Sequence, residues 1–154
     1  MKILRDQDDL AAAFGIPYHV TREGLEPDPQ WVMNNLVYVP LPTPLHSMTR
    51  VRVNIALKAQ VENTLAELVQ RGLWHFFHTC EGGWACRRIA GSSKASFHAW
   101  GAALDFDASE MPRGSTKHWP VMVTVTWARH GFICGQGFKG TKDPMHFQIA
   151  KVYP

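Results

Sequence analysis

Two short motifs contain the residues of this chain that are best suited to chemistry. The first spans residues 96–105 with the sequence SFHAWGAALD, and the second spans residues 143–148 with the sequence DPMHFQ. They supply two imidazoles, His98 and His146, and a carboxylate, Asp105, which are ligand types that zinc prefers. A zinc ion with three protein ligands keeps a fourth position for water, so this set predicts a hydrolytic metal centre.

Residues next to these motifs offer the other groups that hydrolysis needs. A general base takes the proton of the attacking water and passes it to the leaving amine. Asp143 is the candidate, because it precedes His146 by three residues and the intervening Pro144 stiffens the chain. Arg87 and Arg88, ahead of the first motif, are candidate positive donors for an anionic intermediate or for a substrate carboxylate.

The alternation of polar and apolar residues predicts how the motifs are positioned. Within residues 102–107, Asp105 points away from the apolar side chains of a strand, and within residues 145–149 His146 does the same. If the two strands are neighbours, their polar groups converge on one open face. We therefore expect an α+β fold with a small antiparallel sheet that holds the metal on one face and packs helices on the other.

Periodicity and turn residues predict the remaining elements. We expect helices over residues 6–14, 50–71 and 119–130, and strands over residues 36–39, 73–79 and 132–134. Prolines recur between residues 17 and 47, which predicts irregular chain there. A loop is expected over residues 81–93. The chain is thus interpreted as a single domain, residues 1–154, with an irregular N-terminal segment (1–47) and a catalytic core (48–150).

Length and composition are typical of one globular domain. The chain has 154 residues, of which 45% are hydrophobic and 19% are charged. Its net charge of +3 favours a polyanionic partner such as a cell-wall polymer, whereas no run of basic residues indicates nucleic acid. The first residues are too acidic for a signal peptide, and no apolar stretch approaches the ~20 residues of a membrane span. Synthesis in a cytoplasm is therefore expected.

Together the two motifs resemble those of the M15 zinc peptidases. The pattern Ser-x-His-x-x-Gly-x-Ala-x-Asp, followed by Asp-x-x-His-Phe, is similar to that of D-alanyl-D-alanine carboxypeptidases, of dipeptidases and of phage L-alanyl-D-glutamate endolysins. Residues 82–91 resemble the arginine-bearing segment of the endolysin branch, and residues 127–135 resemble its helix-to-strand segment. The resemblance covers about residues 48–150.

The resemblance implies a Hedgehog/D,D-peptidase type of fold and a role for each site residue. It implies Asp143 as the general acid/base and Arg87 as the group that binds the substrate carbonyl or the oxyanion, with Ser96 supporting the site through a hydrogen bond near the metal. The implied Zn²⁺ ligands are His98, Asp105 and His146. Asp143 stands where carboxypeptidases of the family often have Glu, which fits the endolysin branch, and Gln148 stands where Glu is frequent.

The sequence therefore predicts a zinc-dependent peptidase that cuts peptidoglycan stem peptides, with the L-alanyl-D-glutamate bond favoured. We expect a monomer that reaches the cell wall after holin-type release or as a virion-associated lysin. One alternative is a D-alanyl-D-alanine carboxypeptidase. Another, of a different class, is a non-catalytic, metal-containing module that binds the cell wall.

The cysteines and two further histidines leave smaller alternatives open. Three cysteines in a chain without an export signal are interpreted as reduced thiols, although Cys80 and Cys86 could bridge a short loop. The cluster formed by His75, His78, Cys80 and Cys86 is an alternative, structural zinc site. The third cysteine, Cys134, has no assigned role.

Overall fold

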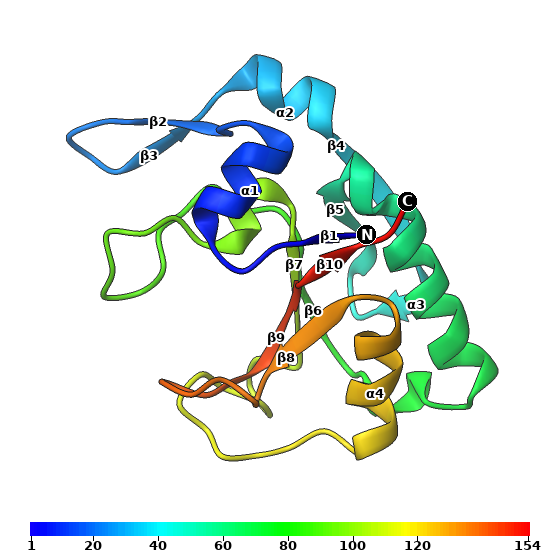
Figure 1. Cartoon of the computed structure of the whole chain (residues 1–154). Helices are drawn as coiled ribbons and strands as arrows, with labels where there is room; N and C mark the ends of the chain where they lie inside the picture. The colour runs from blue at the N-terminus through cyan, green and yellow to red at the C-terminus, as the bar shows by residue number, and fades with distance from the viewer.

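The computed structural model describes all 154 residues and has helices and small antiparallel sheets distributed along the chain (Figure 1). The helices are α1 (Gln7–Phe14), α2 (Pro29–Asn35), α3 (Lys58–Gln70) and α4 (Val121–Arg129), with 3₁₀ turns η1 (Ile55–Leu57), η2 (Trp74–Phe76) and η3 (Phe97–Trp100). The strands are β1 (Lys2–Ile3), β2 (Tyr18–Val20), β3 (Leu25–Pro27), β4 (Leu36–Leu45), β5 (Met48–Asn54), β6 (Cys80–Gly82), β7 (Ala103–Phe106), β8 (Phe132–Gly135), β9 (Asp143–Ile149) and β10 (Lys151–Val152). This arrangement confirms the α+β class.

The sheet that contains both motifs has the strand order β6-β7-β9-β8, and all its pairings are antiparallel. β7 and β9 are neighbours, and Asp105 lies directly opposite His146 in their register. Residues directly opposite each other on neighbouring strands project from the same face of the sheet, so Asp105 and His146 share one face.

Aromatic side chains fill the space between this sheet and α4. The buried Trp127 of α4 lies 4.6 Å from the ring centre of Phe147 and 5.1 Å from that of Phe132. Phe106 of β7 lies 5.9 Å from the same indole. Figure 1 shows α3 and α4 together on one side of the fold. The other face of the sheet is thereby left to the polar residues of the motifs.

The β4–β5 hairpin forms a separate two-stranded sheet beside α3. Val39, Val51 and Val53 are buried, while Arg50 and Arg52, which alternate with Val51 and Val53 along β5, face outward. The alternation is that of a sheet with one covered face. The ends of the chain meet through a short pairing of β1 with β10 (Figure 1). None of the helices has the length and apolar character needed to cross a membrane.

The expectation of irregular chain over residues 17–47 is wrong. This segment forms the β2–β3 hairpin, helix α2 and strand β4. Asp28 caps α2 by accepting hydrogen bonds from two backbone amides, and Pro29 occupies the first turn, where a missing N–H costs nothing. β4 pairs only with β5, so its prolines are tolerated as they are on edge strands. The predicted strand over 36–39 is confirmed and extends to Leu45.

Two other boundaries differ from prediction. The helix expected over residues 50–71 begins only at Lys58, because the alternation of Val51 and Val53 with arginines makes residues 48–54 a strand. Residues 73–79 are not a strand, since Trp74–Phe76 form a 3₁₀ turn and β6 starts at Cys80. The predicted loop over 81–93 accordingly starts inside β6.

The remaining predicted elements are confirmed. Helix α1 occupies the segment 6–14, with Asp6 as its N-cap. Helix α4 occupies the segment 119–130, and β8 contains residues 132–134. Gly72 has φ 66°, as expected for a residue that follows a helix end.

One polar cluster joins α3 to the end of α4. The Glu67 carboxylate of α3 lies 2.6 Å from Nε2 of His130 and 2.6 Å from Nε of Arg71. Arg129 approaches it to 3.5 Å. The hydrogen bond from His130, followed by that from Arg71, outweighs burial and lowers the pKa of Glu67. The lowered pKa means that ionised Glu67 stabilises the folded state.

Replacing Glu67 with Gln should lower the melting temperature at pH 7 by a few degrees. Because the folded-state pKa is depressed, this contribution exists above the unfolded-state pKa and disappears as the pH falls through the folded value. The difference between variant and parent should therefore shrink in acid. Thermal unfolding at pH 7 and pH 3.5 measures it, with Glu62→Gln, which breaks an exposed pair on the same helix, as control. A constant difference at both pH values would contradict the prediction.

Candidate metal centre

Ligand atoms from three residues converge on the open face of the sheet. His98 Nε2 lies 3.1 Å from Asp105 Oδ2, and His146 Nδ1 lies 2.9 Å from Asp105 Oδ1. The two ring nitrogens are 3.2 Å apart. Ligand atoms 2.0–2.1 Å from a tetrahedral zinc are separated by about 3.3 Å, so the observed spacing is close to that of a bound site. All three residues are buried, with at most 9% of their surface exposed.

The hydrogen bonds on the far side of each ring fix its tautomer. His98 Nδ1 lies 2.5 Å from the carbonyl oxygen of Gly83, which can only accept, so Nδ1 carries the proton and Nε2 has a free lone pair. His146 Nε2 lies 3.0 Å from Oε1 of Gln148, and donation to this oxygen leaves the lone pair on Nδ1. The neutral side-chain amide of Gln148 thus orients the ring of His146.

The donor set fits a divalent cation. When both imidazoles are neutral, two lone pairs and a carboxylate face one another, and such an arrangement is repulsive unless positive charge, from a cation or from a proton on an imidazole, lies at its centre. Burial alone raises the pKa of Asp105, but its contacts with His146 and His98 outweigh burial and hold that pKa well below the usual range. Asp105 is therefore the anion that a metal ligand must be.

His98 is positioned by a tight 3₁₀ turn. Ser96 caps this turn, and its hydroxyl accepts a hydrogen bond from the backbone N–H of His98 at 3.3 Å. Gly101 ends the turn with φ 64°. A Cβ at Gly101 would lie 2.7 Å from the backbone nitrogen of Asn54, so only glycine fits there. Ser96 thus acts on the backbone of the ligand residue, and the structure gives its hydroxyl no contact with the three ligand atoms.

A β-bulge positions the second motif. Cys134 of β8 pairs with Phe147 of β9, but the next residue of β8, Gly135, pairs with Asp143. The residues of β9 between these two pairs form the bulge, which bends the strand. The carbonyl of Pro144, inside the bulge, accepts a hydrogen bond from the buried indole of Trp119 at 2.7 Å. The bulge explains why Met145 and His146, although adjacent in sequence, both line the same cavity.

Asp143 has a buried oxygen that makes no hydrogen bond. Its Oδ1 is enclosed without a partner. Burial, with the negative charge of Asp105 adding to it and His146 and Arg113 opposing it, raises the pKa of Asp143 above its ordinary value. A carboxyl group with a raised pKa, lying in a cavity beside a candidate metal centre, is suited to exchanging a proton with a molecule bound in that cavity.

One cavity of about 450 Å³ brings the predicted site residues together. All six line it: Arg87, Ser96, His98, Asp105, Asp143 and His146. Arg87 Nη2 lies 3.7 Å from Asp105 Oδ2, and half of the Arg87 side chain is exposed, so this guanidinium stands at the mouth of the cavity. Arg88 instead donates a hydrogen bond to the carbonyl of Ser93 in an exposed turn.

Other residues of the cavity were missed from sequence. Arg5, Asp6 and Gln7, at the start of α1, lie on its wall, and Arg113 lies on the side of Asp143. Gln7 Nε2 donates to the carbonyl of Ala95, just before the first motif. Because this contact spans 88 residues of chain, no local sequence pattern could indicate it.

The alternative zinc cluster is not assembled. The only group of metal-binding side chains that the structure brings together is His98, Asp105 and His146. All three cysteines are free thiols in the structure, so Cys80 and Cys86 form no bridge. The chain at His78 and Thr79 is instead tied to Asp107, whose carboxylate accepts hydrogen bonds from both backbone amides.

Comparison with known families agrees with this site. A family model for M15 peptidases, described as D-alanyl-D-alanine carboxypeptidase, matches residues 90–149, the stretch that contains all three ligand residues and Asp143. This match confirms the resemblance to the M15 peptidases that was drawn from the two motifs. No curated protein matches the chain.

Changing Gly101 to Ala should impair both folding and metal binding. Alanine in a left-handed conformation costs roughly 1–2 kcal/mol, and here the added Cβ also collides with the backbone of Asn54. Gly91→Ala is the matched control, since Gly91 has φ 73° but open space around its Cβ position. Urea unfolding should show a larger loss of stability for Gly101→Ala than for Gly91→Ala, and zinc titration should show a larger loss of zinc affinity. Equal losses would mean that the close approach does not hold the His98 turn.

Proposed function

We propose that this protein is a zinc-dependent peptidase that cleaves peptidoglycan stem peptides. The observation that supports this most directly is the pair of features in one cavity: three mutually facing acceptor atoms and, beside them, the partnerless oxygen of Asp143. Buried acceptors that face one another, or that have no partner, do not stabilise the fold. In the proposed site the first feature is the set of metal ligands, and the second is the proton acceptor.

Each residue has a distinct part in the proposed reaction. His98 Nε2, His146 Nδ1 and an oxygen of Asp105 would hold the ion. Zinc bound there supplies Lewis acidity and makes water a usable nucleophile near neutral pH. Asp143 accepts the proton of the attacking water and donates it to the leaving amine. Arg87, at the cavity mouth, binds the substrate carbonyl oxygen as negative charge develops on it.

For the bond that is cut, we favour L-alanyl-D-glutamate. The support is the aspartate at position 143, which resembles the endolysin branch. D-alanyl-D-alanine carboxypeptidase is the second candidate, favoured by the description of the matching family model. A lysin released by a holin or delivered with a virion is the biological setting that we propose.

Digestion of purified peptidoglycan tests the function and the bond together. Mass spectrometry of the fragments should show new N-terminal D-glutamate. Release of free D-alanine would instead support the carboxypeptidase. A protein that binds zinc and the wall but releases no fragment would be the non-catalytic module, and the proposed function would then be wrong.

Two substitutions should separate metal binding from proton transfer. Asp143→Asn should keep one zinc per chain and the native melting temperature, yet lower turnover by about 10²–10⁴-fold, because it removes the proton acceptor alone. His146→Ala should lose zinc and activity together. Metal analysis of the dialysed proteins and rates on a soluble stem peptide measure both effects. Near-normal turnover of Asp143→Asn would show that the assigned base is incorrect.

A further inference from the structure

An arginine-rich face lies on the outer side of the β4–β5 hairpin, outside the catalytic cavity. We define it by four residues: Tyr38, Arg50, Arg52 and Trp84. The Arg50 guanidinium carbon lies 3.9 Å from the ring centre of Tyr38. The Arg52 guanidinium carbon lies 5.5 Å from the same ring and 5.2 Å from the indole of Trp84. The two cations are thus stacked on two aromatic rings.

Stacking holds the two guanidinium groups but leaves their hydrogen-bonding edges free. Neither Arg50 nor Arg52 forms a side-chain hydrogen bond or an ion pair within the chain. A guanidinium presents its N–H donors in the plane of the group, in a fork that matches a planar carboxylate. The rings therefore preorganise two unused carboxylate receptors at the surface.

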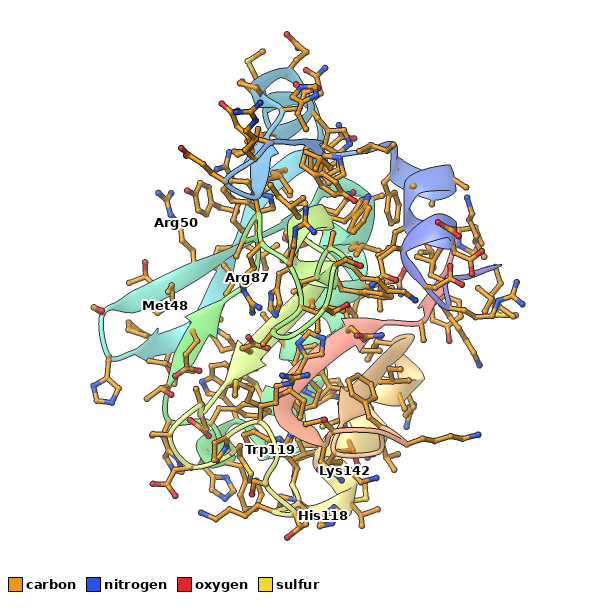
Figure 2. All side chains as sticks on the ribbon, turned by 90° about the vertical axis from the view of Figure 1, so that its left-hand side faces the viewer. Met48, Arg50, Arg87, His118, Trp119 and Lys142 are labelled. Atoms are coloured by element: carbon orange, nitrogen blue, oxygen red, sulfur yellow. The ribbon has the colours of Figure 1, made fainter.

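The arginine-rich face is connected by backbone contacts to the metal centre. The N–H of Trp84 donates to the carbonyl of Arg52 at 2.7 Å, and the indole N–H of Trp84 donates to the carbonyl of Ala99 in the His98 turn. The preceding residue, Gly83, accepts the hydrogen bond from His98. In Figure 2, Arg50 and Arg87 lie on the same side of the molecule. A polymer bound across the cavity mouth at Arg87 would continue toward the hairpin.

We propose that the arginine-rich face is an extended subsite that binds free carboxylates of stem peptides flanking the one being cut. This inference rests on the proposed function, since it takes the same polymer as ligand. Each stem peptide carries free carboxylates, so an intact wall presents those of several neighbouring stem peptides at once, whereas a soluble fragment with one stem peptide presents only its own. The subsite should therefore increase binding to the wall without altering the chemical step.

The test measures sedimentation of zinc-loaded protein with purified, phosphate-stripped peptidoglycan sacculi. In the Asp143→Asn background, adding Arg50→Gln and Arg52→Gln should weaken binding about tenfold. The charge-matched control is Arg22→Gln with Lys151→Gln, two exposed residues without ion pairs, and it should bind like its parent. If the control loses as much binding as the arginine variant, the effect is due to net charge alone and the proposal is wrong. Unchanged binding by the arginine variant would also overturn the proposal.

Modifying the wall carboxylates and substituting the aromatic ring of Tyr38 make the test specific. Amidation of the wall carboxylates should abolish the difference between parent and arginine variant. If only walls that retain their phosphate polymers bind, the ligand is phosphate and the proposal is wrong. Tyr38→Phe should bind like the parent, because it keeps the ring, whereas Tyr38→Ala should weaken binding. Equal binding by both would contradict a role for stacking.

Kinetics separate this proposal from the proposed function. With Asp143 intact, Arg50→Gln/Arg52→Gln should leave kcat/KM on a soluble stem peptide unchanged and lower the rate on sacculi. If soluble peptide is never cleaved by the parent, the proposed function fails, while the sedimentation result still decides the subsite. If cleavage occurs but both substrates are cut equally by the variant, only the subsite fails.

Discussion

Repulsion among three buried acceptors is the constraint that the rest of the structure must resist. Two imidazole lone pairs and the Asp105 carboxylate are held about 3 Å apart in the wall of the cavity, with at most 9% of each residue exposed. With both imidazoles neutral and no cation bound, this arrangement opposes folding, so the elements around it must be stable in their own right. The packing of Trp127 against three phenylalanines behind the sheet provides that stability, because it fixes β7 and β9 in the register that places Asp105 opposite His146.

The N-terminal segment belongs to this support. The indole of Trp100, at the end of the His98 turn, donates a hydrogen bond to the carbonyl of Gly15 at 2.8 Å. Tyr18 packs edge-on against the same indole, with ring centres 5.7 Å apart. Gln7 binds the carbonyl of Ala95 on the other side of the turn. The first residues of the chain, which resemble no family by motif, thus clamp the turn that presents a ligand.

Local patterns in the sequence predicted the site better than they predicted the fold around it. Residue type singled out His98, Asp105 and His146 as candidate ligands, and strand alternation placed Asp105 and His146 on one face, because ligand chemistry and a period of two are local properties. The strand at residues 48–54 was missed because its arginines and valines continue into a helical period without a break. The roles of Gly83 and of the first turn of α1 could not be predicted, since they depend on contacts between distant segments.

Rigid and exposed parts of the site serve different purposes. The ligand residues lie on strands and on a capped turn, where their exposure is at most 9%, so their geometry does not depend on substrate. Arg87 and Arg113 lie in loops at the cavity wall, and half of the Arg87 side chain remains in solvent. Long cationic side chains in such positions can follow a substrate that moves, at little cost in folding free energy. The proposed substrate is a wall polymer, which presents the same bond in many local conformations, and a fixed set of metal ligands with an adaptable cationic rim would suit such a substrate.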